Sequence, residues 1–274
     1  LLRGVIMNNK KICFLGAGKM ASAIIKGLLS SNTFDKEHIV AAEVNPDAAK
    51  IASENFGIKV FAKPEEAVVG ADIILVATKP FVVPQLLDSI KGVVSDQLFV
   101  SIAAGVPFAK YEATLGSEKR FVRVMPNTPL LLECGMSAIC GNSNATPEDL
   151  QTVLEIFSKI GKVITCKETD MDAVTGVSGS GPAFYYYIID KIAKAGEALG
   201  LDYKTALTLS AQTALGAAKM IMETGNTPEE LITALTTPGG TTAEGNKVLN
   251  ESDMAEILME TVRKTAEKSA SMSK

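Results

Sequence analysis

From residue 11 the chain reads Lys11-Ile12-Cys13-Phe14-Leu15-Gly16-Ala17-Gly18-Lys19-Met20-Ala21, and an apolar-periodic stretch follows. The first five residues predict a buried strand, and the glycine-rich hexapeptide after them predicts a tight turn into a helix. In such a G-x-G-x-x-A turn, Gly16 permits the bend, Gly18 lets a pyrophosphate approach the backbone, and Ala21 allows close helix packing. On its own the hexapeptide also fits an ordinary glycine turn. Its place between a strand and a helix favours dinucleotide binding, with the phosphates on the amino end of the helix.

Short apolar runs alternate with amphipathic helical stretches from residue 11 to about residue 166. Several runs are apolar almost throughout, which is typical of strands covered by helices on both faces. The alternation predicts an α/β fold with a Rossmann-type, doubly wound sheet. The expected strands are Lys11–Leu15, Ile39–Glu43, Ile58–Phe61, Asp72–Ala77, Leu98–Ile102, Phe121–Val124, Ser137–Cys140 and Val163–Cys166.

The pattern changes after about residue 168, where strands are no longer evident and long helical stretches begin. We therefore expect two domains, a dinucleotide-binding domain over residues 7–168 and an all-helical domain over residues 169–274. The expected long helices are Pro182–Leu199, Tyr203–Thr224, Pro228–Leu235 and Asp253–Met272.

Local signals mark several helix ends. Thr146 and Thr227 each precede a proline and a pair of acidic residues, which predicts an N-cap at both threonines. Gly161 is expected to close the helix that Thr146 opens, and Gly200 and Gly225 are expected to end two later helices. These boundaries are predicted without any knowledge of packing.

One histidine among 274 residues restricts the chemistry of the chain. A Ser-His-Asp triad would have to use His38, and a metal site with two or three histidines cannot be formed. The four cysteines show no Cys-x-x-Cys pairing and lie in or beside apolar runs, which favours buried thiols in a reducing compartment. We therefore expect neither histidine-centred catalysis nor a metal site.

Charge and hydropathy exclude further classes. Lys plus Arg number 27 and Asp plus Glu number 31, a net charge of −4, and the cations are dispersed, so no nucleic acid or anionic membrane partner is expected. No apolar stretch approaches the length of about 20 residues that a membrane span needs. The six residues before Met7 are too short for a secretory signal, and we expect them to precede the natural start. A cytoplasmic protein is predicted.

Glu43 and Asn45 lie at the end of the second expected strand, which faces the adenosine ribose in a dinucleotide-binding sheet. An acid there accepts a hydrogen bond from the 2′-hydroxyl of NAD, whereas a basic or amide residue tolerates the 2′-phosphate of NADP. Glu43 argues for NAD, although it lies 25 residues beyond Gly18, against a usual spacing of about 20. Asn45 argues for NADP, and Glu43 also fits a solvated strand end. The cofactor preference therefore stays open.

Three further turns follow later strands, namely Thr78-Lys79-Pro80, Ala103-Ala104-Gly105 and Met125-Pro126-Asn127-Thr128-Pro129. Each alone fits a tight turn, and Lys79 fits a solvated cation equally well. The carboxyl ends of strands in an open α/β sheet form one ligand crevice, so we expect these turns to converge with the first glycine turn.

Two glycine- and hydroxyl-rich segments lie in the helical half, Ser178-Gly179-Ser180-Gly181-Pro182-Ala183 and Thr236-Thr237-Pro238-Gly239-Gly240-Thr241-Thr242. Each abuts a helix and places backbone N–H groups and small hydroxyls at its positive end. Helix capping is the alternative, and for Thr242 alone it is an even choice. Together the two segments favour anion binding.

When these segments are considered together, the chain from Lys11 onward resembles the Δ1-pyrroline-5-carboxylate reductase family. The resemblance is carried by Gly16–Ala21, Lys79-Pro80, Ala103–Val106, Met125–Pro129, Asp172–Ala183 and Pro238–Thr242. The last two segments are the most specific, because other nicotinamide-dependent folds do not carry them.

The resemblance implies reduction of a cyclic imine, Δ1-pyrroline-5-carboxylate, to L-proline by NADPH, with NADH as the alternative. It also implies that the helical domain binds substrate and interlocks with a second subunit, so that the active site lies near a homodimer interface; a larger homo-oligomer is left open. The cofactor residues that it implies are Gly16, Ala17, Gly18, Lys19, Met20, Asn45, Ala77, Thr78, Lys79, Pro80, Ala104 and Asn127. The substrate residues are Ser178, Thr237, Gly239, Gly240, Thr241 and Thr242, with Thr242 as the catalytic hydroxyl near the ring nitrogen.

Two positions depart from the family pattern. Glu43 stands where relatives commonly carry a smaller residue, and Asn246 stands where an aliphatic residue is usual, a difference expected to affect packing only. Two other functions remain open. A related imine or β-hydroxyacid reductase is one, although Lys191 and Lys194 on the long helix match no catalytic motif. The other is a non-catalytic dinucleotide-binding protein, which would have no need of the loop Pro238–Thr242.

Overall fold

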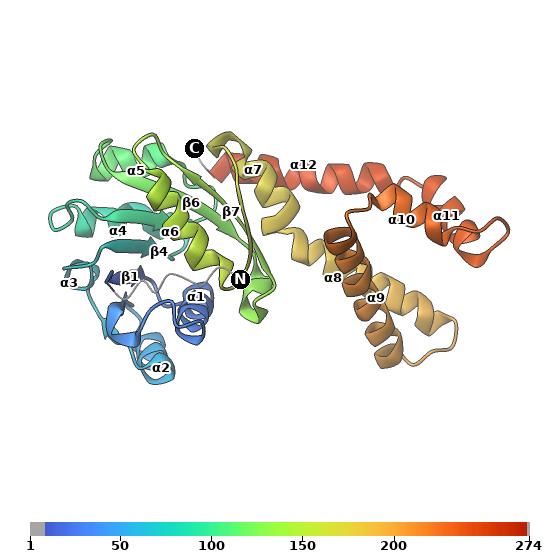
Figure 1. Ribbon diagram of the computed structural model, residues 1–274, viewed down its shortest axis with the longest axis horizontal. Helices are drawn as coiled ribbons and strands as arrows, with labels where there is room; N and C mark the ends of the chain where they lie inside the picture. Colours follow the sequence, from blue (N-terminus) through green and yellow to red (C-terminus); the bar gives the residue numbers. More distant parts are fainter. Residues whose placement is uncertain (1–8, 273–274) are drawn as a thin grey trace. The chain divides into compact units, whose positions relative to one another are not determined.

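The computed structural model describes residues 9–272, and an eight-stranded sheet occupies the first part of this range (Figure 1). The sheet has the order β3-β2-β1-β4-β5-β6-β7-β8. Its first six strands are mutually parallel in the order typical of a doubly wound dinucleotide-binding sheet, which confirms the predicted fold class. The strands are β1 (Ile12–Leu15), β2 (Ile39–Ala42), β3 (Lys59–Phe61), β4 (Ile73–Val76), β5 (Leu98–Ser101), β6 (Arg120–Pro126), β7 (Gly135–Gly141) and β8 (Gly161–Thr165). Residues 1–6, expected to precede the natural start, lie outside the described range.

All eight expected strands are present, with ends that differ by a few residues. The local pattern did not predict that β7 runs antiparallel to β6. The expectation that Gly161 closes a helix is wrong, because that helix ends at Ser158 and Gly161 opens β8 with φ +152°. A Cβ on Gly161 would overlap the backbone of Gly135 on β7, so glycine is required there for strand pairing.

Helices cover both faces of the sheet, and alternate strand residues enter two separate cores. Phe14 packs in the core under α1 (Lys19–Ser30), α2 (Pro46–Phe56) and α6 (Pro147–Ser158). Leu15, the next residue, packs in the core under α3 (Pro64–Ala67), α4 (Val83–Ile90) and α5 (Phe108–Leu115). Each large apolar side chain buried in this way contributes about 1.5–3 kcal/mol, so the two cores hold the strand ends, and the turns that follow them, in fixed positions.

Short helical turns complete this part of the chain. They are η1 (Lys36–His38), η2 (Pro80–Val82), η3 (Thr128–Leu132), η4 (Glu168–Asp170), α7 (Met171–Val174) and η5 (Thr175–Gly179), of which η5 is a π-helical turn. Turns of this kind are rare and are frequent at functional sites, and η5 contains Ser178 from the first of the two glycine-hydroxyl segments.

The four long helices expected from the sequence follow, with α11 between the last two. They are α8 (Gly181–Ala198), α9 (Tyr203–Thr224), α10 (Pro228–Leu235), α11 (Thr241–Asn250) and α12 (Met254–Met272). The chain divides into two compact units, one running to Ser180 and including the segment from Lys264 onward, the other spanning Gly181–Arg263. A functional boundary at residue 168 stays a prediction.

The local signals at helix ends are confirmed at four positions. Thr146 and Thr227 each form a capping box with the acid three residues later, Asp149 and Glu230. Gly200 and Gly225 follow α8 and α9 with φ values of +100° and +76°. Such caps satisfy the unpaired backbone groups of a helix from nearby residues only, which is why sequence alone predicts them.

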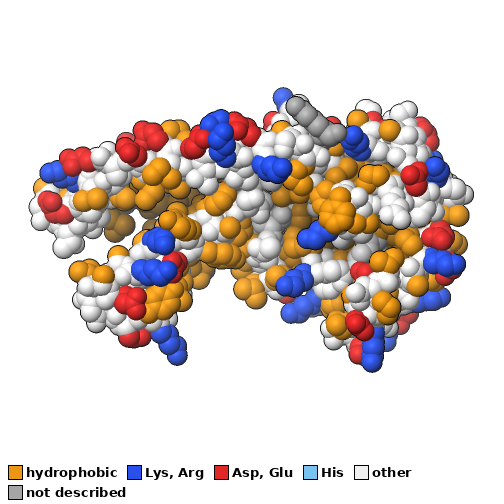
Figure 2. Space-filling model, turned by 180° about the vertical axis from the view of Figure 1, so that it is seen from behind, with side chains coloured by type: hydrophobic (Ala, Val, Ile, Leu, Met, Phe, Trp, Pro, Cys, Tyr) orange, Lys and Arg blue, Asp and Glu red, His pale blue; other side chains and the backbone are white. Residues whose placement is uncertain are grey.

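The unit Gly181–Arg263 leaves most of its apolar side chains exposed. Its buried hydrophobic residues within this chain are Ala193 and Ala206, while Tyr185, Tyr186 and Tyr187 are each at least 60% exposed. Figure 2 shows apolar side chains gathered on these helices. An apolar surface of this extent is typical of a surface that a partner covers.

The cysteines are only partly as expected. Cys13 and Cys140 are buried, and burial raises the pKa of each thiol to about 12, so both stay protonated at neutral pH. Cys166 is half-buried, and Cys134 is exposed, because it lies in the exposed turn between η3 and β7. None of the helices between residues 9 and 272 is both long and apolar enough to cross a membrane. The same residues contain no group of three or more His, Cys, Asp or Glu side chains placed to hold a metal ion.

Candidate active site

The turn after β1 lies against the turn after β4. Gly16 adopts φ +102°, and a Cβ there would lie 2.9 Å from the Ala77 carbonyl oxygen and 3.2 Å from Thr78 Cγ2. The Ala77 N–H donates to the Leu15 carbonyl oxygen at 2.8 Å, which joins the two turns. Gly16 therefore meets both requirements of the glycine turn, a positive φ and a close backbone neighbour.

Gly18 is the N-cap of α1, and open space lies above it. Its φ is −69°, and a Cβ at this position would meet no atom within 4 Å. No described side chain caps α1, so N–H groups of its first turn and its positive end face this space. Lys19 is exposed at the first position of α1, and Met20 beside it packs against the core. The arrangement fits the pyrophosphate of a dinucleotide.

The Thr78 hydroxyl is the second feature of this crevice that fits a bound cofactor. Its Oγ1 is buried and has no hydrogen-bond partner among the described residues. Leaving a buried hydroxyl unpaired costs about 1–3 kcal/mol, so a polar ligand atom at this turn would stabilise it. Lys79 beside it is exposed, and Pro80 opens η2.

Glu43 bridges the glycine turn and the end of β2. Its Oε2 accepts the Ala17 N–H at 2.9 Å, and its Oε1 accepts the Asn45 N–H at 3.0 Å. The interpretation of Glu43 as a solvated strand end is therefore wrong. Ala17 and Asn45, both expected to contact the cofactor, also bond to protein groups. The Ala17 N–H donates to Glu43, and the Asn45 Oδ1 accepts the Ala48 N–H, which makes Asn45 the N-cap of α2.

The turn after β5, which contains Ala104, is braced by the C-terminal end of α12. Gly105 has φ +71°, and a Cβ there would lie 3.3 Å from the Ser269 carbonyl oxygen. The Ser269 hydroxyl is buried and donates to Asp172 Oδ1 on α7 at 2.6 Å. The end of α12 thus links one wall of the crevice to α7.

Asn127, at the end of β6, joins two of the expected site segments. Its Nδ2 donates to the Ser178 carbonyl oxygen at 3.2 Å and to the Ser178 hydroxyl at 3.4 Å, and its Oδ1 accepts the Met136 N–H at 2.9 Å. The residue is only 9% exposed. Both ends of the Asn127 amide are therefore engaged by the protein, and the amide fixes the position of Ser178.

The expected substrate loop lies in the helical unit, between α10 and α11. Gly239 has φ +72°, and the Gly240 N–H donates to the Thr237 carbonyl oxygen at 3.0 Å. Gly240, and not Thr242, is the N-cap of α11, and no described side chain caps this helix. Thr241 and Thr242 are both exposed in its first turn. The loop therefore presents hydroxyls together with the positive end of a helix, which suits a carboxylate.

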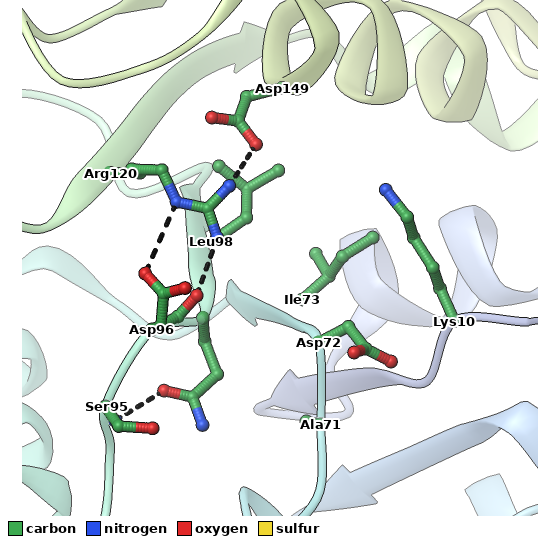
Figure 3. A pocket seen from close by; sticks show the side chains of 10 residues that line it. Lys10, Ala71, Asp72, Ile73, Ser95, Asp96, Leu98, Arg120 and Asp149 are labelled. Atoms are coloured by element: carbon green, nitrogen blue, oxygen red, sulfur yellow. Dashed lines mark hydrogen bonds and ion pairs between the residues drawn. The ribbon is translucent and has the colours of Figure 1, made fainter.

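A separate pocket of about 370 Å³ lies at the opposite edge of the sheet, at the amino ends of β4, β5 and β6 (Figure 3). Arg120 lines this pocket, and its guanidinium donates to Asp149 Oδ1 at 2.6 Å and to the Asp96 carbonyl oxygen at 2.6 Å. Ligands of open α/β sheets bind at the carboxyl ends of the strands, so this pocket is not the cofactor crevice. Through these two bonds Arg120 joins α6 and the segment before β5 to the start of β6.

Two family models match successive parts of this chain. A family model described as pyrroline-5-carboxylate reductase dimerisation matches residues 168–272, and one described as NADP oxidoreductase coenzyme F420-dependent matches residues 11–105. A pyrroline-5-carboxylate reductase of Methanosarcina acetivorans is 42% identical, with 98% of this chain and 100% of the relative covered. The chain belongs to the pyrroline-5-carboxylate reductase family. The resemblance inferred from the sequence is thereby confirmed.

Solved structures of the family have the same fold along the whole chain. The reductase from Coxiella burnetii superposes with a TM-score of 0.92 at 30% identity, covering 97% of this chain and 100% of the other. The pyrroline carboxylate reductase of Plasmodium falciparum, solved with NADP bound, gives a TM-score of 0.88 at 32% identity, covering 97% and 99%.

Asn246 departs from the family pattern by more than packing. Its Nδ2 donates to the Thr236 hydroxyl at 2.9 Å, and that hydroxyl donates to the Ile232 carbonyl oxygen at 2.7 Å. Thr236 precedes the expected substrate loop, and Asn246 lies in the second turn of α11, the helix that follows it. The expectation of a packing difference alone missed this bond, although a polar residue in the place of an aliphatic one was the signal for it.

Proposed function

We propose that this chain reduces Δ1-pyrroline-5-carboxylate to L-proline by hydride transfer from NADPH or NADH, the last step of proline biosynthesis. One observation carries the proposal: a dinucleotide crevice and the Thr237–Thr242 loop at an uncapped helix end occur in the same chain. The names of the relatives support it, and the relative with NADP bound supports the use of NADPH. We also propose that the protein acts in the cytoplasm.

The cofactor residues of the proposal come from five turns at the carboxyl ends of the strands, those after β1, β2, β4, β5 and β6. The bound nicotinamide would supply the hydride. Gly18 and the first turn of α1 would hold the pyrophosphate, and the unpaired Thr78 hydroxyl would bind a polar cofactor atom. The full set is Gly16, Ala17, Gly18, Lys19, Met20, Asn45, Ala77, Thr78, Lys79, Pro80, Ala104 and Asn127, of which Ala17 and Asn127 act through their neighbours.

The substrate residues would act mainly by orientation. The imine nitrogen is basic enough to arrive as an iminium, so the reaction yields a neutral amine and needs no strong acid. Backbone N–H groups of Thr241 and Thr242 would bind the carboxylate, with Ser178, Thr237, Gly239 and Gly240 shaping the site. Holding two reactants in the productive orientation can lower the activation free energy by about 7–11 kcal/mol. The Thr242 hydroxyl would hydrogen-bond to the ring nitrogen, which already carries its proton, and would hold the imine carbon toward the hydride.

A homodimer is part of the proposal, because the helical unit buries two apolar side chains only and matches a dimerisation model. A second copy would cover the exposed tyrosines and the apolar faces of α8 and α9. Assembly of dimers into a larger homo-oligomer is left open.

The test is a turnover assay that follows the oxidation of NADPH, and separately of NADH, with pyrroline-5-carboxylate. We expect saturable turnover and L-proline as the product. Turnover with a β-hydroxyacid and NADP instead would favour the related reductase. Binding of the dinucleotide without turnover of either substrate would favour the non-catalytic protein.

Asn127→Ala is expected to raise the KM for the imine about tenfold, because Ser178 loses the amide that positions it and a bond of about 1.4 kcal/mol corresponds to a factor of ten. The dissociation constant of the cofactor should change little, since both ends of the amide bind protein groups. Steady-state kinetics beside fluorescence titration of the cofactor measure the two effects. An equal loss of cofactor affinity would show that Asn127 contacts the cofactor directly.

Asn246→Leu is expected to raise the KM for the imine by about threefold to tenfold, since a single hydrogen bond contributes about 0.5–1.5 kcal/mol and the loop loses the bond across its two ends. Thr236→Val removes the same bond from the other side and is the matched variant. The double variant should be no worse than Thr236→Val alone, because Thr236→Val already removes the bond that Asn246→Leu removes, together with the bond to Ile232. Additive effects in this cycle would contradict the role of the bond.

A further inference from the structure

Glu43 occupies the point where the adenosine ribose of a dinucleotide meets a doubly wound sheet. Its N–H donates to the Phe61 carbonyl oxygen at 2.9 Å, in continuation of the pairing between β2 and β3. Its carboxylate is held by the N–H groups of Ala17 at 2.9 Å and Asn45 at 3.0 Å. One of these donors belongs to the glycine turn and the other to the turn after β2. The carboxylate is therefore fixed against the cofactor crevice before any cofactor binds.

The fixed carboxylate keeps capacity for further donors. An ionised carboxylate has about four lone-pair sites, and the two backbone N–H groups use two of them. An acid at the end of the second strand accepts hydrogen bonds from the ribose 2′-hydroxyl in sheets of this kind. Glu43 is thus placed and oriented to bind a ribose that carries a free 2′-hydroxyl.

A ribose 2′-phosphate would meet a different electrostatic situation. Such a group carries about −1.5 to −2 charges at neutral pH, and Glu43 and the exposed Asp47 are both acidic. Two cations that follow β2 and β3 in the chain are paired with acids: Lys50 Nζ lies 3.8 Å from Glu54 Oε1, and Lys63 Nζ lies 3.6 Å from Glu66 Oε1. These exposed pairs are weak and would yield to a 2′-phosphate, but that group would still stand beside the Glu43 carboxylate.

We propose that Glu43 is the cofactor-specificity residue of this chain and gives it a preference for NADH over NADPH. The inference rests on the proposed function for the identity of the site as a dinucleotide crevice. It refines that function without excluding NADPH as a donor. The Asn45 Oδ1 caps α2, so the Nδ2 donor is the part of this amide that a cofactor could still use, and it carries no charge to offset that of Glu43.

The test measures dissociation constants of NADH and NADPH for the purified, full-length protein by titrating nicotinamide fluorescence, with kcat/KM for both as a second readout. We expect wild type to bind NADH about tenfold more tightly than NADPH, a ratio that corresponds to one charge-assisted hydrogen bond. Glu43→Gln keeps the shape and one acceptor oxygen but removes the charge, and should shift the ratio toward NADPH by about tenfold. Asp47→Asn, the matched control, removes a neighbouring charge without the bonds to the glycine turn, and should shift the ratio by about twofold at most.

Tighter binding of NADPH than NADH by wild type would overturn the inference, and so would a ratio that Glu43→Gln leaves unchanged. Equal shifts in Glu43→Gln and Asp47→Asn would overturn it too, because they would assign the preference to overall charge. The wild-type ratio is decisive even if the Gln variant fails to fold. A preference for NADH without turnover of pyrroline-5-carboxylate would refute the proposed function and leave the role of Glu43 standing, while turnover with a preference for NADPH would do the reverse.

Discussion

Thr242→Ala should lower kcat about 100-fold, the loss expected when one preorganised hydrogen-bond partner of the reacting centre is removed. Thr242 lies in the exposed first turn of α11, and Gly240, not Thr242, is the N-cap, so the hydroxyl is available for the substrate. Removing it leaves the ring nitrogen without its hydrogen-bond partner at the moment of hydride transfer. The dissociation constants of NADPH and NADH should stay within about twofold, since the cofactor turns lie in the other compact unit.

Thr242→Ser is the control, because it restores the hydroxyl and should recover most of kcat. Thr241→Ala, one residue earlier in the same helix turn, should affect the KM for the imine more than kcat. Single-turnover measurements of NADPH oxidation separate the chemical step from product release. An unchanged single-turnover rate in Thr242→Ala would remove this hydroxyl from the mechanism and leave orientation by backbone N–H groups as its only contribution.

Features that depend on neighbours in the sequence were predictable. Thr146 and Asp149 form the expected capping box because both partners lie within four residues. The strands β1, β2 and β4 were recognisable because each is buried on both faces and therefore apolar throughout. The glycine turn was recognisable because its positive φ, its close approach and its place before α1 all require small residues at fixed spacing.

Features that depend on distant partners were not predictable. The bond from Ala17 to Glu43 spans 26 positions, that from Asn127 to Ser178 spans 51, and that from Ser269 to Asp172 spans 97. Nothing in the local pattern indicates such pairs, because each exists only after the sheet has brought its turns together. The antiparallel direction of β7 was missed for the same reason, since pairing partners are set by the whole sheet. Consequently, the sequence pattern predicted which turns line the crevice but not the bonds that hold Ala17, Asn127 and Ser178 in place.

Gly18→Ala should weaken the binding of both NADH and NADPH by at least about tenfold, while the fold stays intact. A Cβ on Gly18 meets no protein atom within 4 Å, and the backbone φ of −69° suits any residue. The added methyl group would therefore occupy only the space that the pyrophosphate needs, and displacing a charged group from a helix end costs about 1–2 kcal/mol. Fluorescence titration measures the loss of affinity. Thermal unfolding without cofactor should show a smaller loss of stability than Gly16→Ala causes.

Gly16→Ala tests the other role of the glycine turn, its close contact with the turn after β4. It should lower the stability of the protein more than Gly18→Ala does. Here the Cβ would lie 2.9 Å from the Ala77 carbonyl oxygen, and φ of +102° is strained for alanine, so the turns after β1 and β4 must move apart. We expect the free energy of unfolding to fall by about 1–3 kcal/mol from this strain and cofactor binding to be lost together with it. If Gly16→Ala proved as stable as wild type and bound the cofactor normally, the contact between the two turns would not form the crevice. If Gly18→Ala alone bound normally, the pyrophosphate would not lie on the amino end of α1, because the methyl group can interfere with nothing else.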